Sequence, residues 1–210
     1  MPAKEINFYN ISPYLRYIHV DDCIHGGYLI PWRQIYDYEL VFVLSGNLHV
    51  KTERDEYTLT SGDVHIMPPF LRHTRYSDAP IYLYSLHFDL SYMGESNDFS
   101  CLEVYSAPIQ KYLQQHTEIA VDERFIHRPY YSLSNVELPQ KLEVSDTSVY
   151  VKILNQMLDV FDKKPFGFEL DLKICILQLL RHIISDMHSK KKVSLAPWNL
   201  RIHRIAPNIF

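Results

Sequence analysis

The chain has 210 residues, 47% apolar and 22% charged, with a net charge of −4, which is ordinary for one globular domain or one domain with an appendage. No apolar run approaches the roughly 20 residues of a membrane helix, and the N-terminus has no signal-peptide pattern, so we expect no membrane partner. Three cysteines without C-x-x-C spacing exclude a disulfide scaffold and most zinc sites, and they favour a cytoplasmic protein.

Charge is spread unevenly along the chain. Residues 187–210 carry five basic residues and no acidic residue, so the rest of the chain is acidic. An acidic body cannot neutralise many phosphates, so we do not expect this body to bind nucleic acid. We interpret residues 189–210 as a solvated basic linker.

Short strands separated by turns fill residues 14–89. The expected strands are Leu15–Val20, Tyr28–Ile30, Glu39–Leu44, Leu48–Thr52, Glu56–Thr60, Val64–Met67 and Ile81–Phe88. A polar turn at Glu53–Asp55 is typical of a hairpin. Strands this short, at intervals of about 8–12 residues, predict an antiparallel sandwich or barrel.

Residues 91–145 carry only a weak pattern. Pro108–Gln115 is a candidate short helix, and Arg124–Leu142 could hold one or two strands. We assign the remainder to loops and late strands of the same body.

The periodicity becomes helical after three N-cap candidates at residues 145–147. Apolar residues recur at helical spacing from Tyr150 to Phe161, and Pro165 ends this first helix. A second helix is predicted over Glu169–His188, and it is apolar around most of its circumference. More than one side of it should therefore be buried.

One seam of the second helix consists of Leu172, Ile176, Leu179 and Ile183. We expect this seam to hold a homodimer together, because a two-fold dimer is the commonest cover for an exposed apolar patch. The alternative is that one chain covers both sides of the helix, with residues 91–145 as additional cover.

Motifs in the strand region point to a known family. Glu39 followed by Gly46 reproduces the E-x6-G ending of the first cupin motif, and the stretch from Gly62 to His73 reproduces much of the second. The segments RQIYDYELVFVLSG, EYTLTSGDVHIMPPFLRH and YLYSLHFD, followed by the helix pair, resemble the N-terminal sensor domain of AraC-type transcription regulators.

The resemblance implies a fold and a function. In that family a jelly-roll-type cupin barrel binds a small effector, often a sugar, two helices mediate dimerisation, and a helix-turn-helix DNA-binding domain follows. We therefore expect a mainly β antiparallel barrel followed by an α-helical pair, and a natural chain that continues past Phe210 into the DNA-binding domain. The predicted parts are an N-terminal arm (1–13), the barrel (14–144), a helical dimerisation segment (145–188) and the linker (189–210).

Metal chemistry is not expected. Metal-dependent cupins place an H-x-H pair shortly before the motif glutamate, whereas here Trp32–Ile35 contains no imidazole or thiolate. Glu39 and His73 are only two of four expected ligands, fewer than catalytic zinc or non-haem iron takes. G-x-S-x-G, H-E-x-x-H and P-loop motifs are also missing, so we expect no catalytic residue, no metal and no cofactor.

Strand parity predicts the effector pocket. Alternate residues share a face, so Ser85 and His87 lie on one face and the larger apolar residues of the same strand lie beneath the helices. An inward Glu39 needs a charged partner, for which Arg33 is the nearest candidate. The expected ligand-binding residues are Trp32, Arg33, Glu39, His73, Arg75, Ser85 and His87.

Each of these residues also has a structural interpretation. His73 could only hydrogen-bond the backbone at the barrel mouth, Glu39 could be solvated at a strand end, and Trp32 could be a core residue. In the functional interpretation Trp32 stacks on a sugar, and Arg75 meets a carboxylate, a phosphate or a sugar hydroxyl. The set as a whole suits a polar, sugar-sized effector.

Two other functions remain open, as does the role of the arm. The chain could be a metal-dependent cupin isomerase or dioxygenase with atypical ligands, or a stand-alone carbohydrate-binding cupin. The arm at residues 1–13, which contains Ile6 and Phe8, is either a lid over the barrel mouth or a first edge strand.

Overall fold

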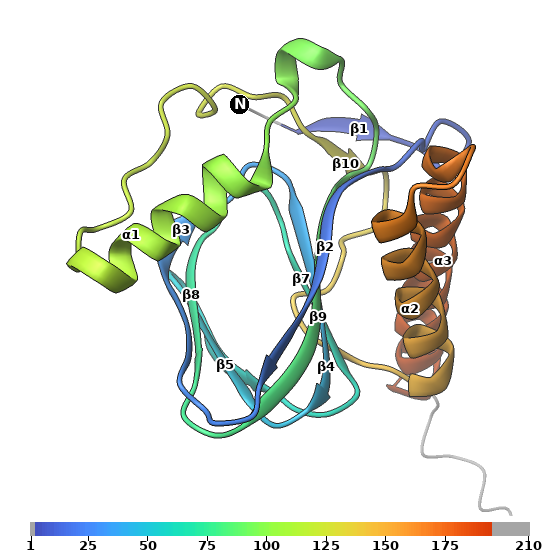
Figure 1. Cartoon of the computed structure of the whole chain (residues 1–210). Helices are drawn as coiled ribbons and strands as arrows, with labels where there is room; N and C mark the ends of the chain where they lie inside the picture. The colour runs from blue at the N-terminus through green and yellow to red at the C-terminus, as the bar shows by residue number, and fades with distance from the viewer. Residues whose placement is uncertain (1–2, 195–210) are drawn as a thin grey trace, which may run out of the picture.

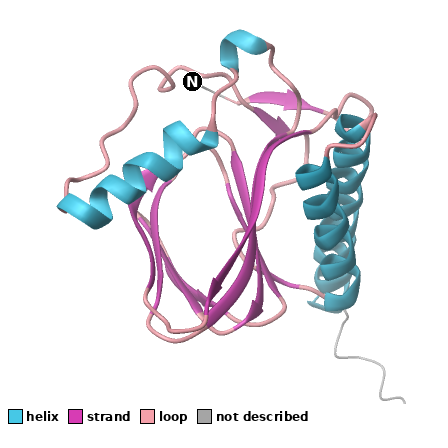
Figure 2. Cartoon of the chain, in the orientation of Figure 1, coloured by secondary structure: helices cyan, strands magenta, loops and turns pink. Residues whose placement is uncertain are grey.

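The computed structural model describes residues 3–194 and contains two antiparallel sheets, a two-stranded parallel sheet and a pair of long C-terminal helices (Figures 1 and 2). The strands are β1 (Lys4–Ile6), β2 (Tyr14–Cys23), β3 (Tyr28–Gln34), β4 (Tyr38–Ser45), β5 (Leu48–Thr52), β6 (Glu56–Leu59), β7 (Asp63–Met67), β8 (Arg72–Ser77), β9 (Ile81–Asp89), β10 (Tyr131–Leu133) and β11 (Leu142–Glu143). The helices are α1 (Ala107–Gln115), α2 (Thr147–Lys163) and α3 (Phe168–Ser194), with a 3-10 turn at Glu95–Asn97 and a π-helical turn at Leu102–Ser106.

The two sheets face each other as the walls of a barrel. One has the strand order β11-β7-β4-β9-β2 and the other the order β3-β8-β5-β6. Figure 1 shows α1 lying across one end of the space between these walls, and α2 and α3 packed on the outside of the five-stranded wall. Hydrogen bonding within residues 3–194 does not continue from one sheet to the other, so the barrel is not fully closed. The predicted mainly β cupin fold with a C-terminal helix pair is confirmed.

The five-stranded sheet separates two hydrophobic clusters. Leu40 and Phe42 of β4 lie on its outer face with Tyr84 of β9, in one cluster with residues of α2 and α3. Val41 and Leu83 lie on its inner face, in a second cluster between the two walls of the barrel. The predicted division of these two strands into an inner and an outer face is confirmed, because successive side chains of a strand point to opposite faces.

Two aspartates stabilise the helix pair. Asp146 caps α2, and Asp186 joins both helices to the end of the barrel. Asp146 caps α2 by accepting from the backbone N–H of Ser148 at 3.0 Å. Asp186 of α3 accepts from Ser145 Oγ at 2.5 Å and from the Tyr150 hydroxyl at 2.9 Å, which joins the end of the barrel to both helices. No helix in the described part of the chain is long and apolar enough to cross a membrane.

The predicted dimer seam lies inside the chain, which corrects its assignment as an interface. Its members Leu172, Ile176, Leu179 and Ile183 are 0–5% exposed and pack into the outer core cluster. Helix α3 is apolar on several sides, and the barrel and α2 cover the side that carries these four residues. Within residues 168–190 of α3, the large apolar side chains that are exposed are those of Leu170, Ile174 and Leu177.

The linker prediction also needs a correction. Helix α3 runs to Ser194, so residues 189–194 continue the helix. Lys190 pairs with Glu143 of β11 at 3.0 Å, which keeps this last part of α3 beside the barrel. The remaining part of the predicted linker, 195–210, lies outside the described residues.

The beginning of the chain forms an edge strand. β1 pairs in parallel with β10, with Lys4 opposite Tyr131 and Ile6 opposite Leu133. Ile6 is buried in the outer core cluster, and neither cavity described below is lined by residues of β1. The arm therefore forms an edge strand on the helix-covered side of the barrel, which is the alternative to a lid given in the sequence analysis.

The strand β8 was not expected from the sequence. It follows Pro68-Pro69 and reads RHTRYS, which has neither apolar alternation nor an apolar run. Its inward-facing positions are polar, with His73 and Arg75 buried between the walls. The short helix expected at Pro108–Gln115 is present as α1.

Candidate functional site

Glu39 lies at the centre of a buried polar cluster on the inner face of β4. Its carboxylate accepts hydrogen bonds from Nη2 of Arg33, at 3.0 Å to Oε1 and 2.8 Å to Oε2. Nη2 of Arg75 and Oγ of Ser85 donate to Oε1 at 2.7 and 3.0 Å. Burial alone would raise the pKa of Glu39, but the two guanidinium groups and His87 outweigh it and hold that pKa well below its usual range.

A second carboxylate, Asp37, lies beside this cluster. Its Oδ1 accepts from the Tyr105 hydroxyl at 2.8 Å and lies 3.0 Å from Nδ1 of His87. Its Oδ2 accepts from Nε of Arg16 at 3.2 Å. The imidazole of His87 thus joins the two carboxylates, because its Nε2 lies 3.4 Å from Glu39 Oε1. Burial disfavours the charged imidazole, but Asp37 and Glu39 overcome this effect and raise the pKa of His87.

A third carboxylate, Asp89, fixes the loop that follows the barrel. Arg128, from the segment between α1 and β10, donates to Asp89 at 2.5 and 3.1 Å and also to the backbone carbonyl of Tyr36 at 2.7 Å. Arg16 reaches the same carboxylate at 2.5 Å. A loop with little secondary structure is thereby held against the barrel by buried ion pairs.

His73 has the structural role that the sequence left open. Its Nδ1 lies 3.1 Å from the backbone carbonyl of Leu71, so Nδ1 carries the proton and donates. Burial, reinforced by Arg33, lowers the pKa of His73 well below its usual value. A neutral imidazole in contact with the backbone positions the end of β8 beside Glu39, whose Oε2 is 3.7 Å away.

A cavity of about 190 Å³ lies next to this cluster between the two walls of the barrel. We call it the inner cavity. Its charged and polar lining consists of Tyr17, His19, Asp21, Tyr28, Arg33, Glu39, Arg75, His87, Tyr105, Ser106 and Gln110. Several polar atoms of these residues are buried without a hydrogen-bond partner, namely Nε and Nη1 of Arg75, Nε of Arg33, the hydroxyl of Tyr28 and Nδ1 of His19.

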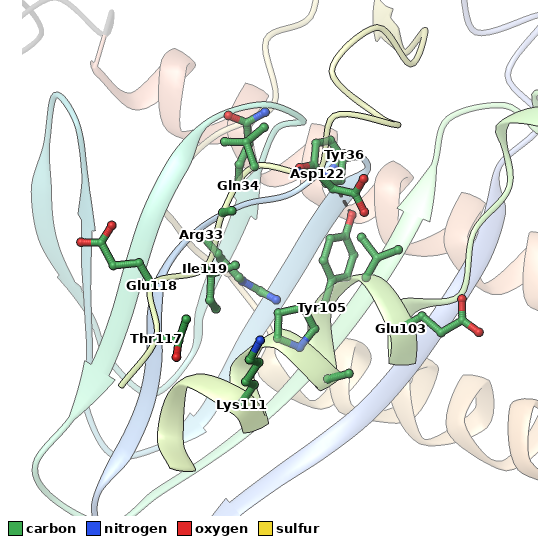
Figure 3. Close-up of a pocket in the computed structure, with 15 residues that line it drawn as sticks. Arg33, Gln34, Tyr36, Glu103, Tyr105, Lys111, Thr117, Glu118, Ile119 and Asp122 are labelled. Atoms are coloured by element: carbon green, nitrogen blue, oxygen red, sulfur yellow. Dashed lines mark hydrogen bonds between the residues drawn. The ribbon is translucent and has the colours of Figure 1, made fainter. Parts of the chain in front are cut away.

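A second, larger cavity of about 550 Å³ adjoins it, and we call this the outer cavity. Arg33 and Tyr105 line both cavities, and α1 contributes Lys111 to the outer one and Gln110 to the inner one. Figure 3 shows Arg33 and Lys111 directed into the outer cavity, while Glu103 and Glu118 point away from it. The helix α1 therefore forms a wall shared by the two cavities.

The structure brings most of the predicted ligand-binding residues together. Arg33, Glu39, Arg75 and His87 line the inner cavity. Ser85 and His73 belong to the same cluster but do not line the cavity. Ser85 donates to Glu39, and Nε2 of His73 lies 3.7 Å from Oε2 of Glu39.

Trp32 stands apart from the others. It follows the alternation of β3 onto the opposite face from Arg33, where Arg72 stacks over its ring at 5.7 Å. The interpretation of Trp32 as a stacking platform within this cluster therefore finds no support.

Sequence reasoning did not identify Arg16, Asp37, Asp89, Tyr105 and Arg128 as members of the cluster. Asp37 carried a usable signal, because it lies two residues before Glu39 and so shares its face. The others come from β2, from the end of β9, from the π-helical turn and from a loop. No local pattern connects such distant segments.

The residues do not fit the metal site of metal-dependent cupins. Glu39, the motif glutamate, is bound by two guanidinium groups, whose positive charge opposes a cation there. Asp37, His87 and Cys101 bring one possible ligand atom each within 4.8 Å of one another. Both oxygens of Asp37 are, however, already engaged by Arg16, His87 and Tyr105.

Comparisons with known proteins agree with this architecture. Residues 23–128 match the model of the family described as the AraC-like ligand binding domain. No curated protein matches the chain.

Among solved structures, the chain is similar to several cupins over about a third of its length. A cupin-2 domain containing protein from Shewanella frigidimarina has 17% identity over 33% of this chain and 64% of that chain, with a TM-score of 0.28. A cupin superfamily protein from Desulfitobacterium hafniense has 13% identity over 36% and 64%, with a TM-score of 0.30. A putative ethanolamine utilization protein Q from Salmonella typhimurium has 18% identity over 35% and 56%, with a TM-score of 0.29. The match spans less than two thirds of each of these three structures.

Proposed function

The chain belongs to the family of AraC-like ligand binding domains, and from this premise we propose that its barrel senses a small polar effector and thereby regulates transcription. The observation that carries the proposal is the buried cluster around Glu39 beside the inner cavity. Buried polar atoms normally have hydrogen-bond partners. Here the cavity-lining Arg75, Arg33 and Tyr28 all keep donors without one, which is the arrangement expected of a binding site that its ligand completes.

The effector class that we favour is a sugar or a related polar metabolite. The cavity offers guanidinium, hydroxyl, imidazole and amide groups, which together can bind several hydroxyl groups. A volume of about 190 Å³ is small compared with the 300–1,000 Å³ of typical drug-sized sites. A compact molecule such as a single sugar ring suits this space better than a larger metabolite.

Regulation of DNA binding is proposed to pass through a homodimer. The solvent-facing residues Leu170, Ile174 and Leu177 follow one another at helical spacing on α3, and they are 37–62% exposed. A partner copy covering this seam would remove an apolar stripe from water. DNA contact is assigned to a helix-turn-helix domain following Phe210. The free thiols of Cys23, Cys101 and Cys175 suit a cytoplasmic location.

A metal-dependent cupin enzyme is the alternative, and the group Asp37, His87 and Cys101 is the observation in its favour. A cation there would have to displace Arg16 from Asp37. Elemental analysis of the purified protein distinguishes the two functions. About one iron, zinc or manganese ion per chain would support the enzyme.

The effector proposal is tested by a thermal-shift screen of the full chain against sugars, sugar phosphates and small acids. A ligand at 100 times its dissociation constant adds about 2.7 kcal/mol of stability, which raises the midpoint measurably. The shift should be lost in Arg33→Met and kept in Trp32→Ala, since Trp32 lies outside the cluster. No shift with any of the three classes would contradict the proposal.

A further inference from the structure

Two of the three buried carboxylates in the cluster, Asp37 and Asp89, are paired with Arg16 and Arg128, and Arg16 contacts both of them. Asp89 contacts Nη2 of Arg128 at 2.5 Å. Asp37 contacts Nε of Arg16 at 3.2 Å. These groups lie deep in the barrel end, with side chains no more than 4% exposed. The third carboxylate, Glu39, is the sole partner carboxylate of both Arg33 and Arg75 among the described residues, so two guanidinium groups share one anion.

Arg33 and Arg75 share Glu39 unequally. Arg33 contacts both carboxylate oxygens, whereas Arg75 uses only Nη2 on Oε1. The side chain of Arg75 is 1% exposed, and its Nε and Nη1 have no partner. One buried positive charge is therefore left over once Arg33 has neutralised Glu39, and Arg75 carries it.

The neighbouring ionisable groups do not remove this excess. His87 lies between Asp37 and Glu39, and these two carboxylates raise its pKa, so it supplies no negative charge to the cluster. Asp98, a further carboxylate beside the cluster, pairs with Arg16 and not with Arg75. Asp21 lines the inner cavity as well, but its side chain is a quarter exposed and pairs with His19 at 3.2 Å. A carboxylate in contact with solvent neutralises a buried cation much less than one in direct contact does.

Two buried guanidinium groups that share one carboxylate keep an uncompensated positive charge, which is unfavourable, and a bound anion would supply the missing charge. We propose that the effector is a small carboxylic acid whose carboxylate binds Arg75 in the inner cavity. The inference rests on the proposed effector-binding function and specifies its ligand class. An acid is expected because an anion can both accept hydrogen bonds from the unpartnered donors of Arg75 and compensate its excess positive charge.

The remainder of the ligand should carry hydroxyl groups. Tyr28 lines the cavity with an unpartnered hydroxyl, and Ser106 and Gln110 offer further neutral donors and acceptors. These groups suit the hydroxyls of a hydroxy acid or a sugar acid. The small volume of the cavity favours a molecule with few carbon atoms.

Matched ligand pairs test the charge requirement. Thermal unfolding of the full chain is measured with D-gluconate, D-glucuronate and L-lactate, with D-glucose and glycerol as neutral counterparts and glucose 6-phosphate as a different anion. We expect at least one carboxylate to raise the midpoint and its neutral counterpart to leave the midpoint unchanged. Glucose 6-phosphate should have a smaller effect than the best acid.

A pair of arginine variants on the same strand supplies the control. Arg75→Met should weaken binding of the active acid roughly tenfold to a hundredfold, the range expected for a lost hydrogen bond to a charged group. Arg72→Met should leave binding unchanged, because Arg72 is exposed and stacks on Trp32. Without any ligand, Arg75→Met should leave the unfolding midpoint unchanged or raise it, whereas Arg33→Met should lower it.

The outcomes separate the inference from the function on which it rests. A neutral sugar that stabilises the protein as well as its acid does would overturn the carboxylate and leave the effector-binding function intact. No response to any class would contradict both. Arg75→Met that destabilises the ligand-free protein as much as Arg33→Met does would show that Arg75 carries no excess charge, and would overturn the inference without any ligand.

Discussion

The two faces of the five-stranded sheet are built on different physical principles. On the outer face, Leu40 and Phe42 pack under α2 and α3 among apolar side chains. On the inner face of the same strand, Glu39 is surrounded by guanidinium and imidazole groups. The outer face is stabilised by removal of apolar area from water, which depends little on pH. The inner face also carries apolar residues such as Val41 and Leu83, but its polar part around Glu39 is stabilised only while the charges match. That part should therefore respond differently to substitution, pH and ligand.

The largest effect is expected from breaking the charge balance of the inner face. Glu39→Gln keeps the shape of the side chain but leaves Arg33 and Arg75 buried without their carboxylate. Removing one partner of a buried ion pair costs about 3–5 kcal/mol. Urea unfolding of the variant measures the loss. A loss of unfolding free energy below about 1 kcal/mol would show that water screens the charges of this cluster, so that its ion pairs contribute little.

A somewhat smaller effect is expected from the outer face. Leu154 of α2 is fully buried against the sheet, and Leu154→Ala should lower the free energy of unfolding by about 3 kcal/mol through lost burial and a cavity. Unlike the loss in Glu39→Gln, this one should stay constant across pH, because no titratable group contacts change. Urea unfolding at pH 6 and pH 8 makes the comparison, and a strongly pH-dependent loss would contradict the distinction between the faces.

The histidines of the inner face should give stability a maximum near neutral pH. Burial lowers the pKa of His65 to about 4, so the unfolded chain binds more protons below pH 6.5 and the unfolding free energy falls toward acid by up to about 3 kcal/mol. The pKa of His87 is raised, so its contribution is complete below pH 6.5 and is lost as pH rises through its folded-state pKa.

Variants separate these two slopes. His65→Gln should reduce the decline of the unfolding free energy between pH 6.5 and pH 5 without abolishing it, because the pKa of His73 is lowered as well. His87→Gln should flatten the decline on the alkaline side. Chemical unfolding in half-unit steps from pH 5 to pH 8.5 measures both. Identical profiles for the original chain and both variants would mean that these imidazoles do not control the pH response.

The smallest effect on stability is expected on the solvent side of α3. Ile174→Asp changes a residue that is 42% exposed, so the free energy of unfolding should change by no more than about 0.5 kcal/mol. Its effect should appear in assembly, with sedimentation changing from dimer to folded monomer. Ile176→Asp is the matched comparison, because Ile176 is buried and its variant should fail to fold. A dimer that survives Ile174→Asp would place the interface elsewhere.

Much of the fold could be predicted because it is encoded locally. Alternation along β4 and β9 separates the two faces, and the N-cap at Asp146 marks the start of α2. The strand β8 escaped prediction because its polar pattern makes sense only once His73 and Arg75 are known to face the buried Glu39. The side of α3 that meets the barrel was also hidden, since apolar residues surround that helix.

The candidate site was predictable only in part, for a related reason. Arg33, Glu39 and His87 follow from strand parity and from the need to pair a buried charge. Arg16 and Arg128 are partners of the cluster through contacts between segments far apart in the chain. Such pairings depend on tertiary structure, and a single sequence contains no periodic signal for them.

A sheet one residue thick separates the inner cavity from the helices. Glu39 faces the cavity. Phe42, three residues further along β4, stacks on Tyr150 of α2 with ring centroids 5.8 Å apart. Since neighbouring residues share one backbone, any displacement of β4 by a molecule in the cavity must also shift the surface on which α2 rests. Ligand binding in the cavity can therefore change the position of the helices through displacement of the sheet itself, without a hinge or a moving loop.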